Sequence, residues 1–329
     1  MTTNPVKISR SIVPFACRAS LLIWFSYLAP NCIAQVSALS SSVNGTTSGY
    51  DSPVHLADLE YQPIRESSGI AASRRNPNLF WTHNDSGDEP FIYAFDRRGK
   101  HRGVWRVLGA KAEDWEDMAI GPGPNRSTSY LYLGDIGNNS KTREEMMVYR
   151  VVEPLISSRD SSSSKQNPRT TQPADVIRLK YPDGKQNAET LLVHPSTGDL
   201  YIVTKVSGEA ARVYKAKAPL LKSVVTILKH IGEVRFPNAL MGVITGGGIS
   251  PDGRRVILCD YIEAFELVLS EKPGVAFDTI WKQPLIPVNI GARQQGEAVC
   301  YSADGMALFA TSERLPCPLI ELKRRMAGR

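Results

Sequence analysis

Short runs of apolar residues, separated by turn-forming residues, repeat along the chain from Glu66 towards the C-terminus. In each repeat one strand-like run leads through a turn rich in Gly, Pro, Asn or Asp into a second run, and a third run follows. The predicted first strands contain ESSGIAAS, EDMAI, ETLLV, GGGIS and GEAVCY, and the second strands end at Asp85, Asp135, Lys205, Asp260 and Glu313. Successive ends are 50, 70, 55 and 53 residues apart, a period typical of β-propeller blades.

A fourth strand is predicted in four of the five repeats, at residues 102–109, 175–184, 224–234 and 277–285. The fifth repeat runs out of chain after its third strand, whereas residues 55–61 form a strand-like segment ahead of the first repeat. Pairing of that segment with the last repeat would close the ring and remove two exposed sheet edges. The pattern therefore predicts an all-β protein, a single β-propeller of five four-stranded blades closed by an N-terminal strand. Six blades are the alternative.

Two segments depart from the repeat pattern because they are polar and rich in Ser and Thr. Residues 157–173 interrupt the second repeat, and we expect a disordered surface loop there whose deletion changes stability little. Residues 35–52 are predicted to be a linker that precedes the propeller domain at residues 53–329.

The first 34 residues have the pattern of a secretory signal peptide. Basic residues end at Arg18, an apolar stretch covers residues 19–29, and small residues precede a possible cleavage point before Gln35. Eleven apolar residues are too few to cross a bilayer of about 30 Å as a helix; a retained membrane anchor is the alternative. We expect a secreted or periplasmic protein that is not inserted in a membrane after cleavage.

Charge and cysteine content exclude several classes of protein. The formal net charge of +6 falls to +3 without the first 34 residues, and no basic stripe remains, so we expect no nucleic-acid partner. Cleavage would leave three of the five cysteines, an odd number that argues against a disulfide framework. We expect a monomer.

Acidic residues gather where the repeat pattern brings strand ends together. In a propeller the start of a first strand and the end of the second lie on the same face, so the fold predicts one axial site. We expect five carboxylates there to bind a divalent metal: Asp85, Glu116, Asp135, Glu189 and Glu297. Oxygen ligands without sulfur suit calcium first and magnesium second. The alternative is that these acids end strands by accepting hydrogen bonds from loop amides.

Three residues are candidates for chemistry at this axial site: His83, Glu116 and Lys205. His83 lies two residues before Asp85 and could act as a general base, although a hydrogen-bonded structural role is the alternative. Lys205 is the one cation among the strand-end positions, where it either pairs with a carboxylate or contacts an anionic substrate.

The runs THNDSG, DWEDMAIGP, YLGDIGNN, ISPDGRRV and QGEAVCYSADG resemble an uncharacterised family of mostly exported bacterial β-propellers. More distantly, the chain is similar to NHL, gluconolactonase-like and phytase-like propellers. That likeness implies calcium on the propeller axis. The bacterial family has Arg-Thr-Tyr where this chain has Cys259, Asp260 and Tyr261, so the resemblance does not extend to Asp260.

Two functions follow from these patterns. The first is a metal-dependent hydrolase that acts on a lactone, ester or phosphoester, with a small-molecule or anionic substrate at the axial face. The alternative is a non-catalytic propeller that binds a ligand or protein there and uses calcium structurally. For either function, Glu189→Gln is expected to weaken metal binding and to leave the metal-free protein equally or more stable.

Overall fold

The computed structural model describes residues 49–222, 224–237 and 243–325, and these residues form five sheets whose strands are antiparallel except for β9 and β14, which pair in parallel with β5 and β10. The predicted signal peptide lies outside the described residues.

Sheet one contains β2 (Ser67–Ala72), β3 (Leu79–Asn84), β4 (Phe91–Asp96), β5 (His101–Arg106) and the short β9 (Arg169–Thr170). Sheet two contains β6 (Trp115–Pro122), β7 (Ser129–Asp135), β8 (Met146–Val152), β10 (Asp175–Lys180) and β14 (Val225–Ile227). Sheet three contains β11 (Ala188–Val193), β12 (Leu200–Thr204), β13 (Ala211–Ala216) and β15 (Lys229–Val234). Sheet four contains β16 (Gly246–Ile249), β17 (Arg255–Cys259), β18 (Ala264–Val268) and β19 (Ile286–Val288). Sheet five contains β20 (Gln295–Tyr301), β21 (Ala307–Glu313), β22 (Pro318–Lys323) and β1 (Val54–Asp58).

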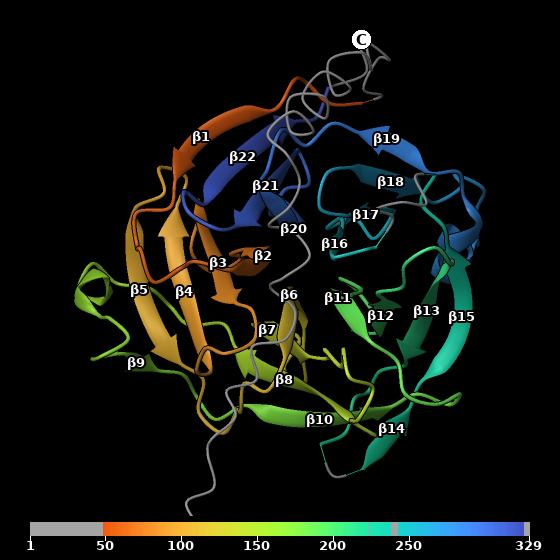
Figure 1. Ribbon diagram of the computed structural model, residues 1–329, viewed down its shortest axis with the longest axis horizontal. Helices are drawn as coiled ribbons and strands as arrows, with labels where there is room; N and C mark the ends of the chain where they lie inside the picture. Colours follow the sequence, from red (N-terminus) through yellow and green to blue (C-terminus); the bar gives the residue numbers. More distant parts are fainter. Residues whose placement is uncertain (1–48, 223, 238–242, 326–329) are drawn as a thin grey trace, which may run out of the picture. The chain divides into compact units, whose positions relative to one another are not determined.

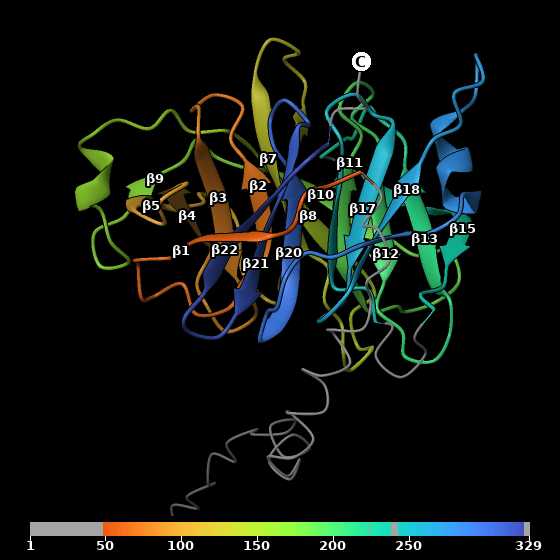
Figure 2. The ribbon, with the colours of Figure 1, turned by 90° about the horizontal axis from the view of Figure 1, so that it is seen from above.

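These sheets are the blades of a five-bladed β-propeller, which confirms the predicted fold. Each first strand contacts the first strands of both neighbouring blades, in the ring order β2, β6, β11, β16, β20 and back to β2. Figure 1 shows the five sheets around a common axis, and in the turned view of Figure 2 the inner strands run across the thickness of the ring. In the part of the chain that the structure describes, no helix is long and apolar enough to cross a membrane.

Large side chains on alternate positions of the strands fill the space between blades. Trp81 and Trp105 of the first blade pack with Trp115 and Leu133 of the second in one buried cluster. Phe80, Phe95 and Phe309 pack in the same way between the first and fifth blades. Burial of each such side chain stabilises the fold by roughly 1.5–3 kcal/mol. This packing holds the inner strands, and the residues at their ends, in fixed positions.

The ring is closed as predicted, because β1 pairs antiparallel with β22. The register joins His55 to Ile320 and Asp58 to Pro318. Further towards the N-terminus, Tyr50 is buried, and its hydroxyl donates a 2.6 Å hydrogen bond to Glu266 of the fourth blade.

Two predicted fourth strands are wrong in detail. Residues 277–285 were expected to form the outer strand of the fourth blade, but Phe277–Lys282 is a 3-10 helix, and the three-residue β19 takes the outer position. The helix buries Ile280 and Trp281 in the core between the third and fourth blades, so its apolar residues are explained by packing without a strand. Residues 224–234 divide into β14, which joins the second blade, and β15, which joins the third.

The expectation of a disordered loop at residues 157–173 is also wrong. We refer to this segment as the strap, because it leaves the second blade and lies along the outer strand of the first (Figure 1). Its β9 pairs in parallel with β5, and buried Ser163 accepts a 2.8 Å hydrogen bond from the amide of Val104. Apolar burial is small, as the composition predicted, but hydrogen bonds to an open sheet edge order the segment.

Deletion of the strap, with Ile156 joined to Ala174, is expected to lower the free energy of unfolding by about 2 kcal/mol. The deletion removes the bonds from Val104 to Ser163, from Leu108 to Thr171 and from Thr171 to Arg106, each worth about 1 kcal/mol. The shorter loop offsets part of that loss. Urea denaturation of the two proteins measures the difference, and coincident unfolding curves would contradict it.

Candidate metal centre

A β-bulge recurs near the start of the first strand in four of the five blades. In each case the first strand has one more residue than the second strand opposite it, and the extra residue is Ser68, Glu116 or Glu189 in the first three blades. In the fifth blade the irregularity spans Glu297 and Ala298. Because a bulge re-aims side chains next to it, the repeated bulges explain why Glu116, Glu189 and Glu297 come together although they are far apart in sequence.

The fourth blade has no carboxylate at the start of its first strand, where three glycines stand instead, Gly246 to Gly248. A Cβ on Gly246 would lie 1.9 Å from the carbonyl oxygen of Glu297. At Gly246 the inner strand therefore approaches that of the fifth blade too closely for a side chain. Its pairing with β17 is regular and has no bulge.

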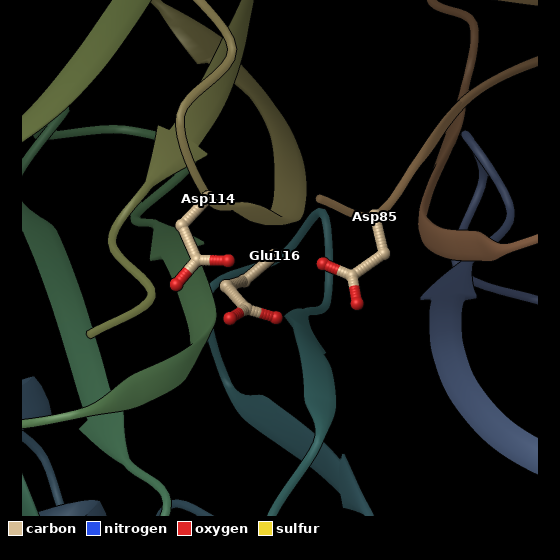
Figure 3. A group of neighbouring side chains, drawn as sticks. All are labelled: Asp85, Asp114 and Glu116. Carbon is tan, nitrogen blue, oxygen red and sulfur yellow. The ribbon is translucent and has the colours of Figure 1, made fainter. Parts of the chain in front are cut away.

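Three carboxyl groups meet where the first and second blades adjoin: Asp85, Asp114 and Glu116. One oxygen from each lies within 4.8 Å of the others, and Figure 3 shows the three groups converging. Burial and the charge of Asp85 raise the pKa of Asp114 to about 6. Burial, together with the neighbouring acids Glu189 and Asp85, raises the pKa of Glu116 well above its usual range.

Asp114 was missing from the predicted ligands, although the sequence contains a signal for it. Residues two apart in an extended chain point to the same side, so a ligand at Glu116 implies Asp114 as its neighbour. Trp115, between them, points to the other side and is buried in the core between blades.

Lys205 lies at the end of β12 in the third blade and pairs with a carboxylate. Its ammonium group forms an ion pair with Oε1 of Glu189 and lies 5.3 Å from the ring centre of Tyr261. Burial alone would lower the pKa of Lys205, but the attraction of Glu189 raises it above the usual range. The other carboxylate oxygen of Glu189, Oε2, is buried without a hydrogen-bond partner.

The fifth blade contributes two carboxyl groups that share hydrogen bonds. The side-chain amide of Gln295, through Nε2, donates to Glu313 and, at 3.3 Å, to Glu297, and the hydroxyl of Ser68 donates to Glu297 at 3.2 Å. Burial and the adjacent Glu313 raise the pKa of Glu297 well above its usual range. Burial and further acids, Asp85 among them, raise that of Glu313 to about 7.

These residues form what we call the axial cluster: Asp85, Asp114, Glu116, Glu189, Glu297, Glu313 and Lys205. Four of the five predicted metal ligands belong to it, namely Asp85, Glu116, Glu189 and Glu297. Asp114 and Glu313 complete it; Glu313 was identified at a strand end but was not among the predicted ligands.

Asp135, the fifth predicted ligand, lies behind the cluster. It pairs with Trp115 in the sheet and so occupies the register position of Asn84, one residue before that of Asp85. Its carboxylate forms a 2.8 Å ion pair with Arg143 and accepts a 3.1 Å hydrogen bond from the backbone amide of Asp114. Asp135 therefore supports the loop that carries Asp114.

His83 and Asp260 each make hydrogen bonds of the kind expected for structural residues, while His83 Nε2 and Asp260 Oδ2 are buried without a partner. His83 is fully buried, contacts the edge of Trp115 and has Nδ1 2.8 Å from the carbonyl oxygen of Asn84. Burial lowers the pKa of His83 to about 4, so the ring is neutral at pH 7. Asp260 accepts hydrogen bonds from the amides of Ile262 and Glu263 and thereby shapes its own loop.

Comparison with known proteins finds similar structures but no matching family model or curated sequence. No protein-family model matches the chain, and no curated protein matches it. The structure is similar to hydrazine synthase of Kuenenia stuttgartiensis, with 12% identity, 80% of this chain and 72% of that chain covered, and a TM-score of 0.41. It is also similar to a chain of a nidogen/laminin complex, with 12% identity, coverage of 76% and 73%, and a TM-score of 0.42. Identities and TM-scores this low carry no argument about function, and the resemblance to an exported bacterial family remains a prediction.

Proposed function

We propose that this β-propeller binds a divalent cation, calcium before magnesium, in its axial cluster and hydrolyses a lactone, ester or phosphoester there. The observation that carries the proposal is the convergence of Asp85, Asp114 and Glu116, since one carboxyl oxygen from each lies within 4.8 Å of the other two. Like charges this close repel by about 1 kcal/mol in water and by several times more in a partly buried site. A cation would remove that repulsion.

The donor set fits a hard cation. Every candidate ligand is a carboxylate oxygen, which calcium and magnesium prefer, and no sulfur or imidazole is among them. A second observation points the same way, because Glu189 is 4% exposed and its Oε2 has no hydrogen-bond partner. Asp85, Asp114 and Glu116 would hold the ion, with Glu189 beside them.

A bound divalent cation supplies a Lewis acid that polarises a reacting carbonyl, phosphoryl or water oxygen. The proton transfer that hydrolysis needs falls to the pair Glu297 and Glu313, since this pair keeps a proton near neutral pH. Lys205 would orient a substrate oxygen. His83, the other predicted base, is sequestered against Trp115, so we assign it no proton transfer.

The charge of the cluster favours a neutral substrate within the proposed range. Six carboxyl groups face one lysine, so a divalent cation still leaves an excess of negative charge while the acids are ionised. A phosphoester would bring further negative charge into this site, whereas a lactone or carboxylic ester would not. We therefore place lactones and esters ahead of phosphoesters.

A non-catalytic binding role is the second candidate, and one observation favours it: the described axial residues include no imidazole or thiol that could serve as a nucleophile or base. In that case the cation would pin the blades together beneath a bound ligand. For both roles we propose action after export, secreted or periplasmic, on the basis of the predicted signal sequence.

Calcium at a hundredfold excess over its dissociation constant is expected to stabilise the protein by about 2.7 kcal/mol, and Glu116→Gln is expected to abolish most of that gain. Thermal unfolding of both proteins with calcium and with chelator measures this. Hydrolysis of lactone, ester and phosphoester substrates under the same conditions separates the two roles. Identical wild-type melting curves with calcium and with chelator would refute the proposed cation binding. Stabilisation by calcium without hydrolysis of any substrate would favour the binding role.

A further inference from the structure

The loop that carries Asp85 is fixed by the side chain of the residue before it. Asn84 Oδ1 accepts hydrogen bonds from the amides of Arg65 (3.0 Å) and Glu66 (3.2 Å), and Nδ2 donates to Asp88 at 2.7 Å. The amide of Asp85 donates a 3.0 Å hydrogen bond to the carbonyl oxygen of Glu66. The position of Asp85 therefore depends on where Asp88 holds the rest of this loop.

Asp88 receives four donors, which is unusual for a residue in a surface loop. Besides Asn84 they are the hydroxyl of Tyr93 at 2.6 Å, the amide of Glu89 at 2.8 Å and the ammonium group of Lys165 at 2.5 Å. Burial alone would raise the pKa of Asp88, but the bonds from Lys165, Tyr93 and Asn84 lower it below its usual range. Asp88 is thus a fixed anion, in contrast to the acids of the axial cluster.

Lys165 reaches Asp88 from the strap, which leaves the second blade and lies against the outer strand of the first. Its backbone amide donates a 3.0 Å hydrogen bond to the hydroxyl of Tyr61, and its ammonium group lies 5.6 Å from the ring centre of Phe91. These contacts define one place for the side chain, which is 31% exposed. Lys165 therefore ties the strap to the loop of Asp85.

The strap emerges from the second blade, which also carries Asp114 and Glu116. It thus joins the two blades whose carboxyl groups meet at the candidate metal centre. We propose that the strap is a positioning device for the metal site: Lys165, through Asp88 and Asn84, sets the position of Asp85 relative to Asp114 and Glu116. This inference rests on the proposed cation binding and adds residues that touch no ligand.

Replacement of Lys165 or Asp88 is expected to weaken calcium binding about tenfold. This is the lower end of the loss found when residues that support metal ligands are replaced. Calorimetry on the full chain measures calcium affinity for wild type, Lys165→Met and Asp88→Asn. Lys165→Arg should restore affinity to within about threefold, since arginine keeps the ion pair. Lys100→Met is the matched control, because it removes the same charge from an exposed pair with Glu60 on the same blade.

Terbium luminescence provides a reading that general destabilisation would not change. The lifetime of bound terbium reports how many waters coordinate it, and a displaced Asp85 would let an additional water bind. Lys165→Met and Asp88→Asn should shorten the lifetime, whereas Lys100→Met should not. All measurements are made below the unfolding temperature of each variant. If Lys165→Met does not fold, Asp88→Asn tests the same ion pair.

The outcomes distinguish this inference from the proposed function. If wild type binds neither calcium nor terbium, the metal site itself is refuted, and the inference with it. If wild type binds both ions, and Lys165→Met and Asp88→Asn behave like Lys100→Met, then the strap has no role in positioning Asp85. Lower affinity with rescue by Lys165→Arg and a shorter terbium lifetime supports the inference.

Discussion

Without added metal, the free energy of unfolding is expected to fall by about 2 kcal/mol as the pH rises from about 6.5 to about 8. Burial and Glu297, against the opposing effect of Lys205, raise the pKa of Glu189 to about 8, and Glu313 is raised to about 7. A carboxyl group with a higher pKa in the folded state stabilises the fold below its ordinary pKa. That contribution is lost as the pH rises through the folded value, because the folded protein then gives up a proton that the unfolded chain has already lost.

The pH range begins at about 6.5 so that the titration of histidines does not mask the titration of the carboxyl groups. The pKa of His83 is lowered to about 4, so its contribution has the opposite sign and changes only below the ordinary histidine value of about 6.5. Urea denaturation in chelator across the range measures the loss. Saturating calcium should flatten the profile, and Glu313→Gln should remove about 1 kcal/mol of the dependence. A flat profile in chelator would mean that the axial acids are ionised and solvated independently.

The fold was predictable because blade strands leave a local signal. Hairpins with Asn-Pro, Pro-Gly and Asp-Gly turns recur at a regular spacing, and the surplus strand at residues 55–61 has one place to pair. The errors arose where tertiary contacts decide the local structure. Residues 277–282 have the apolar content of a strand, but they become a 3-10 helix that buries Trp281 between blades.

The strap shows the same limit in a polar segment. Composition reports apolar surface, and residues 157–173 have little of it, so disorder was the natural expectation. The open edge of β5 and the carboxylate of Asp88 supply hydrogen-bond partners for it. Neither partner is near the strap in sequence, so no local pattern could have revealed them.

The axial site was predicted in outline, and the misplaced residue follows from one register position. Repeat spacing treated Asp135 as equivalent to Asp85, yet Asp135 pairs with Trp115 and faces Arg143. The bulges that turn Glu116 and Glu189 inward are conformational features, and sequence alone does not distinguish them from regular pairing. A shift of one residue along a strand turns the side chain to the opposite face of the sheet, which is why Asp135 points away from the axial cluster.

Of the two roles left open for Lys205, the structure shows the ion pair with a carboxylate, that of Glu189. This ion pair revises the expectation for Glu189→Gln. Loss of the carboxylate relieves repulsion among the acids, but it also leaves Lys205 without its partner. The metal-free Glu189→Gln protein should therefore gain no stability, and the more informative substitution is that of the lysine.

Lys205→Met is expected to lower the free energy of unfolding of the metal-free protein by about 3 kcal/mol at pH 10 and by much less at pH 6. Breaking a buried ion pair leaves one charge uncompensated, which typically costs about 3–5 kcal/mol, and the 20% exposure of the Lys205 side chain favours the lower end. At pH 6 the carboxyl group of Glu189 takes up a proton, since its pKa is raised to about 8, and it then needs no ammonium group beside it.

Lys215→Met is the matched control: Lys215 pairs with Asp199 and Asp278 outside the cluster. Hydrogen bonds from Ala218 and Lys215 outweigh the effect of burial and lower the pKa of Asp199, so the loss in the control should be equal at both pH values. Denaturation of the three proteins in chelator measures the difference, and a loss for Lys205→Met that does not depend on pH would show that Lys205 does not balance titrating acids on the axis.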